Sequence, residues 1–347
     1  MLDEYLKILH NEFSELETDK SFRELTTVEI GGPAKAFLEV KSSEELVKAL
    51  IVVKTHSIPY FVIGGGSNLL VSDQGVDKLV IKVATRSIVV EEGLVRAQAG
   101  TSLQELVDFS IKNSLTGIQK MTGIPGTIGG AIYGNAGAYG QMIGDHLEFV
   151  SAYDLEKQEV VILTREECGF EYRSSAFKTN GCVILDATFK FSPGDKESLS
   201  RESSEVLAMR LKKYKPGLKC PGSFFRNLFT SEVPKSALEK LPPREDTYGK
   251  TPAYVFIEAL GLKGRRVGDV EITDFHGNLF VNLGNGTAQD FWDLAHLCYQ
   301  QVKDRFGVEL HPEVQLVGLP SISSEFTVHP DYIGVHGNFF AWLWTGS

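Results

Sequence analysis

One hydroxyl group lies in the middle of an unusual run, CPGSFFRN, at residues 220–227. Ser223 follows Pro221 and Gly222, so its hydroxyl is presented on a turn. A serine in this setting can be a nucleophile, a proton donor, a phosphate ligand or only a turn residue. The run breaks the G-x-S-x-G pattern of a nucleophile elbow. Few histidines lie near it in the sequence, so a Ser–His–acid hydrolase is unsupported, and a positioned general acid stays open.

Two charged residues could act with such a serine. Arg173, in GFEYRSSAFK, lies between strand-like segments, and its fixed fork of donors suits a carboxylate or an enolate. Glu313, in LHPEVQLVG, opens a strand, and in a cleft its carboxyl group could orient or protonate a substrate. The simpler interpretation of Arg173 is a surface ion-pair residue, and that of Glu313 is a solvated residue at the start of a strand. The basic run 210–219 could receive a diphosphate, or be only the polar end of a helix.

Two glycine-rich runs interrupt the first half of the chain. IGGGSNLLVSDQG, residues 63–75, follows an apolar strand, and its backbone N–H groups could form an anion nest, with Ser67 and Asn68 as further donors. GIPGTIGGAIYGNAGAYG, residues 123–140, holds seven glycines in 18 residues. Its amides around Gly129, Gly130 and Asn135 could serve a pyrophosphate. A tight crossing of backbones is the alternative, but two such runs together favour a dinucleotide cofactor. The first run is a poor match to a Rossmann fingerprint.

Periodicity predicts the elements that must position these residues. Capping boxes at Ser42 and Ser102 predict two amphipathic helices, and a long helix is expected between Thr287 and Gly307. Residues 198–214 read as a charged helix, and residues 147–191 read mostly as strands. Because strand-like and helix-like segments alternate, we expect an α+β fold.

Composition narrows the function classes. The chain has 347 residues, 42% of them hydrophobic, which favours two or three domains. A net charge of −10 disfavours nucleic acid and anionic membranes as partners. We expect no membrane insertion, no secretory signal and no metal. The cysteines are widely spaced, which disfavours a zinc site or disulfide framework and fits a reducing, cytoplasmic setting; they are Cys168, Cys182, Cys220 and Cys298.

Taken in order, these pieces resemble the UDP-N-acetylenolpyruvoylglucosamine reductase family. The resemblance covers about Thr26 to Gly318 and rests on seven motifs in register: TTVEIGGPA, IGGGSNLL, GIPGTIGGAIYGNAGAYG, EYRSSAFK, PGSFFRN, IEALGLKG and HPEVQLVG. It implies an FAD-binding domain of the vanillyl-alcohol-oxidase type in two subdomains, and then an α+β substrate domain. The expected limits are 1–22 for an N-terminal helix, 23–90 and 91–195 for the subdomains, 196–318 for the substrate domain and 319–347 for a C-terminal extension.

The resemblance also implies roles for single residues. Arg173, Ser223 and Glu313 match the family's catalytic residues, with Ser223 as the proton donor. Lys215, or else Lys213, matches a substrate-binding lysine, and Asn227 and Tyr172 are taken as further substrate contacts. The FAD loops fall on Gly64, Gly65, Gly66, Ser67, Asn68 and Leu69, and on Gly123, Pro125, Gly126, Gly129, Gly130, Asn135 and Gly137.

The implied reaction belongs to the synthesis of peptidoglycan precursors. NADPH reduces FAD, flavin N5 passes hydride to the terminal enolpyruvyl carbon of UDP-N-acetylglucosamine enolpyruvate, and UDP-N-acetylmuramate forms. The short interval between Phe191 and Ser223 resembles the family type that lacks a tyrosine lid. Gln315 stands where many members have Arg. We expect a monomer, with a dimer through the aromatic tail as the alternative.

Three rival readings stay open. An FAD oxidase of the same superfamily would be reoxidised by oxygen, and often tethers its flavin through His or Cys, neither of which occurs in the glycine runs. A catalytically inactive nucleotide-sugar binder should lack one of Arg173, Ser223 and Glu313. An ordinary α/β protein whose glycine-rich runs are only structural turns would bind no flavin.

Overall fold

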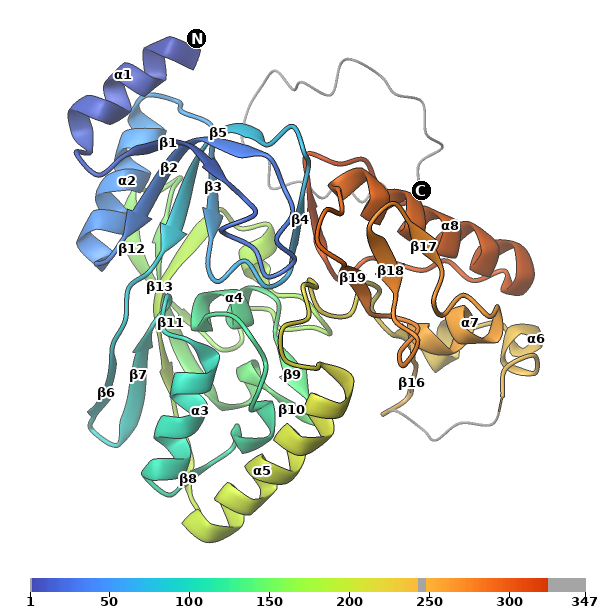
Figure 1. Ribbon diagram of the computed structural model, residues 1–347. Helices are drawn as coiled ribbons and strands as arrows, with labels where there is room; N and C mark the ends of the chain where they lie inside the picture. The colour runs from blue at the N-terminus through green and yellow to red at the C-terminus, as the bar shows by residue number, and fades with distance from the viewer. Residues whose placement is uncertain (1, 243–247, 324–347) are drawn as a thin grey trace.

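The computed structural model describes residues 2–242 and 248–323. The chain forms two sheets stacked one above the other and a smaller C-terminal unit beside them (Figure 1). The aromatic tail lies outside the described residues, as does most of the expected C-terminal extension.

The first sheet has the strand order β1-β2-β5-β3. Its strands are β1 (Glu17–Ser21), β2 (Pro33–Val40), β5 (Val76–Val83) and β3 (Tyr60–Ile63). β2 and β3 both run parallel to β5, so a crossover must join them, and α2 (Ser43–Thr55) provides it. α1 (Leu2–Glu12) lies at the same end of the molecule as α2 (Figure 1).

The predicted start of α2 is correct, but its capping box forms only in part. The Ser42 side chain accepts from the Glu45 N–H, while the Glu45 carboxylate accepts from the N–H of Lys41 instead of Ser42. Its buried face follows helical spacing and consists of Leu46, Ala49, Leu50, Val52 and Val53.

The second sheet has the order β12-β11-β13-β7-β6 and is antiparallel throughout. Its strands are β6 (Ile88–Glu91), β7 (Leu94–Gln98), β11 (Leu147–Asp154), β12 (Glu159–Thr164) and β13 (Cys182–Phe189). α3 (Leu103–Lys112), with the complete Ser102–Glu105 capping box that was predicted, packs beside α5 (Lys196–Lys213). The second glycine run is not wholly extended, since it contains the short helix α4 (Ile128–Tyr133).

The C-terminal unit packs around α8 (Ala288–Phe306), which starts at the predicted Thr287 cap and ends at Gly307 with a φ of 64°. The sheet β17 (Arg266–Val267), β18 (Val270–Ile272) and β19 (Phe280–Asn282) and the helix α7 (Ala253–Ala259) adjoin it. The core of this unit includes both phenylalanines of the serine run, Phe224 and Phe225.

Short elements complete the fold. Besides β17, the two-residue strands are β8 (Leu115–Thr116), β9 (Gly137–Ala138), β10 (Gln141–Met142), β14 (Ser192–Pro193), β15 (Leu228–Phe229) and β16 (Lys250–Thr251). The remaining helical turns are α6 (Lys235–Leu238), η1 (Gln119–Met121), η2 (Ile143–His146), η3 (Ala176–Lys178) and η4 (Thr230–Glu232).

One strand pair joins the far ends of the chain. β20 (Gln315–Val317) runs parallel to β4 (Leu69–Val71), which lies within the first glycine run, just after its three glycines. Leu70 therefore packs in the core of the C-terminal unit, although it belongs to the N-terminal half. The domain limits expected from the sequence stay predictions.

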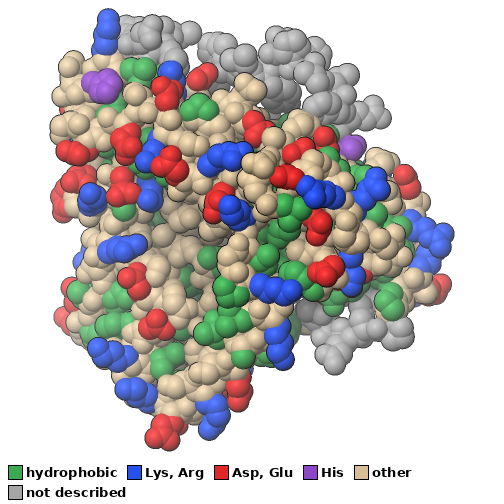
Figure 2. All heavy atoms as spheres, in the orientation of Figure 1, with side chains coloured by type: hydrophobic (Ala, Val, Ile, Leu, Met, Phe, Trp, Pro, Cys, Tyr) green, Lys and Arg blue, Asp and Glu red, His purple; other side chains and the backbone are tan. Residues whose placement is uncertain are grey.

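The surface carries charge of both signs. Figure 2 shows Lys and Arg side chains interspersed with Asp and Glu over the face in view. All four cysteines are free and buried. Within the described ranges, no helix has the length and apolar character needed to span a membrane.

Candidate active site

The two glycine runs meet, although about sixty residues separate them in the chain. A methyl group built on Gly64 would lie 2.4 Å from Thr127 Oγ1, and one on Gly65 would lie 3.2 Å from the Cα of Gly126. Ser67 Oγ donates to the carbonyl oxygen of Pro125 at 3.2 Å. The runs therefore cross at van der Waals distance, which only residues with small or absent side chains permit.

The first run presents unused amide donors at this crossing. Gly66 has a φ of 63°, and within the described part of the chain the N–H groups of Gly65, Gly66 and Ser67 donate no hydrogen bond. Successive amides around a left-handed residue form an anion-binding nest. The unused amides are compatible with the predicted anion cradle, which stays a prediction.

The three amides expected to bind a pyrophosphate in the second run are already engaged. The N–H of Gly129 donates to Ala99 O at 2.8 Å, that of Gly130 to Thr127 Oγ1 at 3.3 Å and that of Asn135 to Ile132 O at 3.2 Å. These groups cannot be the free pyrophosphate donors that the sequence suggested. Any contact of this run with a ligand must use other atoms.

The other residues expected in the cofactor loops also hold the fold together. The Gly123 N–H donates to Gln104 Oε1 at 2.7 Å, and its carbonyl accepts from Arg210 at 3.1 Å. Leu69 is buried in β4.

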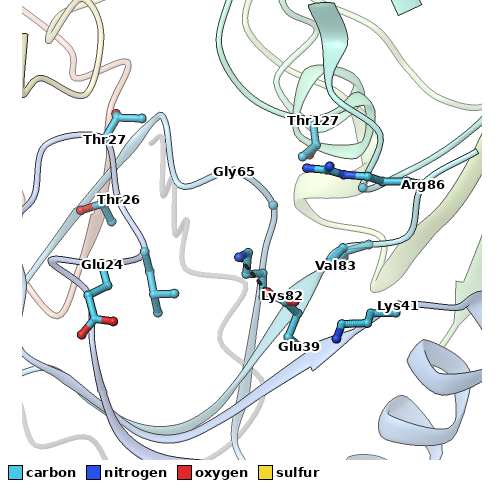
Figure 3. Close-up of a pocket in the computed structure, with 14 residues that line it drawn as sticks. Glu24, Thr26, Thr27, Glu39, Lys41, Gly65, Lys82, Val83, Arg86 and Thr127 are labelled. Carbon is cyan, nitrogen blue, oxygen red and sulfur yellow. Dashed lines mark hydrogen bonds and ion pairs between the residues drawn. The ribbon is translucent and has the colours of Figure 1, made fainter. Parts of the chain in front are cut away.

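A cavity of about 620 Å³ opens beside the crossing. Gly64, Gly65 and Thr127 line it, with Thr26 and Thr27 on the far side (Figure 3). Its charged lining is mixed: Lys41, Lys82 and Arg86 face the same space as Glu24 and Glu39, and Lys82 is paired with Glu39 at 2.8 Å. This volume and polarity suit part of a nucleotide cofactor.

The predicted arginine and glutamate contact each other. Arg173 Nε lies 2.8 Å from Glu313 Oε1, and both side chains are half-buried. The contact is an ion pair and not an aligned hydrogen bond, since Arg173 Nε has no hydrogen-bond acceptor. Residues 140 positions apart are thus brought together.

Arg173 is held in an unusual backbone conformation. Its φ is 57°, which is uncommon for a residue with a side chain. Its Nη1 donates to Gly137 O at 3.1 Å, and the ammonium group of Lys178 donates to Arg173 O at 2.7 Å. Burial lowers the pKa of Lys178, and the guanidinium of Arg226 lowers it further. Lys178 therefore ties down the strained turn that aims Arg173.

The first glycine run also reaches the glutamate. Asn68 Nδ2 donates to Glu313 O at 3.0 Å, and the N–H of Gln315 donates to Asn68 O at 3.0 Å. Asn68, expected from the sequence to contact the cofactor, therefore connects the cradle to the ion pair. Gln315 itself lies in β20.

Ser223 begins an extended segment held on both sides. The N–H of Phe224 donates to Asn278 O at 3.0 Å, and its carbonyl accepts from the N–H of Glu313 at 2.8 Å. The buried Asn278 side chain also bonds both polar backbone groups of Phe225. Ser223 is thus one residue from a direct backbone link to Glu313.

Two side chains contact the Ser223 hydroxyl. Lys213 Nζ lies 3.3 Å from Ser223 Oγ, and Tyr214 Oη lies 3.1 Å from it. Lys215, the preferred lysine from the sequence, instead lies over the Phe275 ring at 4.1 Å. The helix α5 ends at Lys213, and this end determines which lysine faces the serine.

The remaining expected substrate contacts lie across the same region. The Tyr172 ring packs against Phe229 and under the ammonium group of Lys250. Asn227 Oδ1 accepts from the N–H of Ala253 at 3.4 Å. Burial raises the pKa of the Tyr172 phenol, and the nearby backbone of Asn227 opposes that rise.

Sequence reasoning missed Lys178, Thr127, Tyr214 and Asn278. Lys178 and Thr127 lie inside quoted motifs, and a search for polar residues within them could have found both. Nothing local marks Asn278, because its role depends on a strand pairing across 53 residues.

A half-buried histidine near the serine predicts acid sensitivity. Burial lowers the pKa of His276 to about 3, helped by the charge of Lys213, and its Nδ1 accepts from the Asn278 N–H. The unfolded chain takes up this proton near the ordinary value of about 6.5. Stability should therefore fall as pH falls through this window, by up to about 1.4 kcal/mol per pH unit. Urea unfolding of His276→Gln at neutral and acidic pH should show a smaller loss than the parent.

The control for this experiment is His10→Gln, because His10 is exposed. It should keep the parent's acid sensitivity. An equal loss of stability in the parent and in His276→Gln would contradict the assignment.

Comparisons with known proteins agree with this geometry. Residues 214–317 match the family described as UDP-N-acetylenolpyruvoylglucosamine reductase, C-terminal domain, and residues 34–162 match an FAD binding domain family. The reductase of Rubrobacter xylanophilus is 38% identical over 89% of this chain and 97% of its own, and that of Solibacter usitatus is 37% identical over 83% and 92%. The crystal structure of the Thermus caldophilus reductase covers 87% of this chain and 98% of its own, with 32% identity and a TM-score of 0.69. The chain therefore belongs to the UDP-N-acetylenolpyruvoylglucosamine reductase family of FAD-dependent oxidoreductases.

Proposed function

We propose that this chain reduces the enolpyruvyl group of UDP-N-acetylglucosamine enolpyruvate to give UDP-N-acetylmuramate, with FAD as cofactor and NADPH as reductant. The observation that carries the proposal is the Arg173–Glu313 ion pair, joined by backbone hydrogen bonds to both Ser223's segment and the first glycine run. We place the reaction in the cytoplasm, where a nucleotide sugar is at hand and thiols stay reduced. Its product serves peptidoglycan synthesis.

The first glycine run and its cavity fit FAD. Unused amides at Gly65, Gly66 and Ser67 suit a pyrophosphate, and Lys41 and Arg86 add positive charge to the cavity wall. When bound, FAD supplies the hydride chemistry, which side chains cannot supply. The chain's own residues must place the substrate and handle its charge and proton.

Arg173, oriented by Glu313, stabilises the negative charge that develops on the substrate. When the terminal carbon gains a hydride, negative charge grows on the adjacent carbon and its carboxylate. A guanidinium group fixed by Gly137 O and by the Lys178-held turn needs little reorganisation to stabilise that charge. Glu313 orients the guanidinium group through their 2.8 Å contact.

Ser223 is the proposed proton donor to the adjacent carbon. Its hydroxyl accepts a hydrogen bond from Lys213 at 3.3 Å, because an ammonium group can only donate. A donor aimed at the oxygen favours its deprotonated form. We assign the substrate-facing lysine to Lys213, and Asn227 and Tyr172 stay proposed substrate contacts.

The rival readings have less support. An inactive binder should lack a member of the catalytic set, whereas Arg173, Ser223 and Glu313 are all present and connected. Among the residues that line the cavity there is neither His nor Cys to tether a flavin, as an oxidase often does. Anaerobic flavin bleaching by NADPH, followed by recovery on adding the enolpyruvyl substrate, tests the reaction class directly.

Flavin retention tests the crossing of the glycine runs. Gly64→Ala should yield protein with clearly less than one flavin per chain, because its methyl group would meet Thr127 Oγ1 at 2.4 Å. Flavin absorbance per mole of protein measures the effect. Gly93→Asn is the control: Gly93 lies in the β6–β7 turn with nothing within 4 Å of a built Cβ, and Asn tolerates its left-handed φ. Full flavin content in Gly64→Ala would contradict the crossing's role.

Lys178→Met tests how Arg173 is held. Loss of one charge-assisted hydrogen bond is worth about 1.5–3 kcal/mol, so flavin reoxidation by the substrate should slow by roughly ten- to hundredfold. Flavin reduction by NADPH should persist. Lys190→Met is the matched control, since Lys190 is exposed and makes only a long surface contact with Glu148. Equal rates for both variants would remove Lys178 from the site.

Ser223→Ala tests the proton donor. Substrate reduction should slow by about 10²–10⁴-fold, the usual contribution of a general acid. Reduction of the flavin by NADPH should survive, because it uses no proton from Ser223. Stopped-flow measurement of the two half-reactions separates them, and a parallel fall in both would show a structural role for Ser223.

A further inference from the structure

After Ser223 has donated its proton, its hydroxyl group must be regenerated. Each turnover converts the hydroxyl into an alkoxide, which must regain a proton before the next turnover. An aliphatic alcohol is a very weak acid, so its alkoxide takes a proton readily from any stronger acid within reach. The proton source must therefore contact Ser223 Oγ and also reach solvent.

Tyr214 has both properties. Its hydroxyl oxygen lies 3.1 Å from Ser223 Oγ, and either group can be the donor. Its side chain is half-buried, so the residue borders solvent as well as the serine. Among the described residues, the only other side chain that forms a hydrogen bond with Ser223 Oγ is Lys213.

The surroundings of Tyr214 suit a residue that carries negative charge briefly. The guanidinium carbon of Arg210 lies 5.1 Å from the centre of its ring, and Lys213 Nζ lies 5.0 Å from it. Both cations would stabilise a phenolate. A phenol is also a much stronger acid than an aliphatic alcohol, so proton transfer from a phenol to an alkoxide runs downhill.

We propose that Tyr214 returns the proton to Ser223 after each turnover, acting through the serine as a positioning and relay residue. This inference rests on the proposed function. The O–H bond of Tyr214 breaks, its electron pair stays on the phenolate oxygen, and a new O–H bond forms on Ser223. Water then protonates the phenolate, so the net proton comes from solvent. Lys213 holds the serine oxygen in line while this happens.

The test compares one turnover with many. Reduced enzyme is mixed anaerobically with the enolpyruvyl substrate, and flavin reoxidation gives the first turnover; product formation with NADPH gives the steady state. Tyr214→Phe keeps the ring near its two cations and removes only the hydroxyl. Its first turnover should stay within about threefold of the parent, while its steady-state rate falls by about tenfold or more after a burst of one product per site.

Two further variants fix the interpretation. Tyr254→Phe, which removes a phenol packed on His276 and not bonded to Ser223, should match the parent in both phases. Tyr214→His restores a donor at this position and should recover part of the steady-state rate, whereas a merely structural defect would not be relieved. Flavin content and urea unfolding establish that each variant folds.

Several outcomes would overturn the relay. An unchanged steady-state rate in Tyr214→Phe would show that Ser223 regains its proton elsewhere. An equal slowing of both phases would mean that Tyr214 only orients the serine, and a raised KM with unchanged kcat would make it a substrate contact. Failure of the parent itself to be reoxidised by the substrate would instead reject the proposed function.

Discussion

The close contact between two glycine runs is the constraint on which the site depends. Gly64 and Gly65 lie against Thr127 and Gly126, and no side chain larger than hydrogen fits at Gly64 without displacing Thr127. The same short loop then turns through Gly66, and Asn68 bonds the backbone of Glu313 and of Gln315. A cavity wall, a set of unused amides and the carboxylate of Glu313 are thus placed by one segment of seven residues, 63–69. Displacing that segment should disturb all three together.

Charge within the site is opposite to that of the whole chain. The chain carries a net charge of −10, yet the guanidinium of Arg226 and the ammonium of Lys178 lie near the Arg173–Glu313 pair. Arg173 and Lys178 are half-buried and Arg226 is exposed, and gathering three cations around one carboxylate is unfavourable unless a further anion joins them. The lowered pKa of Lys178 reflects that cost. A substrate carboxylate would supply the missing negative charge, which gives the site a physical preference for an anionic ligand.

Sequence reasoning succeeded where the determinants are local. The caps at Ser102, Thr287 and Gly307 are short-range hydrogen bonds or a backbone conformation, and they were located to the residue. It failed where the structure depends on contacts between segments that are far apart in the sequence. Glycines conceal helix propensity, so α4 was missed, and its amides are consumed by the fold. The motifs and family resemblance named Arg173 and Glu313, but only the parallel pairing of β20 with β4 explains how Glu313 comes to lie beside the first glycine run.

The choice between Lys213 and Lys215 shows how a helix end can set the chemistry of a site. α5 ends at Lys213, Tyr214 caps it, and the chain then turns through Gly217 with a φ of 81°. This geometry points two consecutive residues at Ser223 and leaves Lys215 on Phe275. One residue more of helix would rotate these side chains by about 100° each. Ser223 therefore acquires both its neighbouring cation and its neighbouring phenol from the place where a helix ends, ten residues before it in the chain.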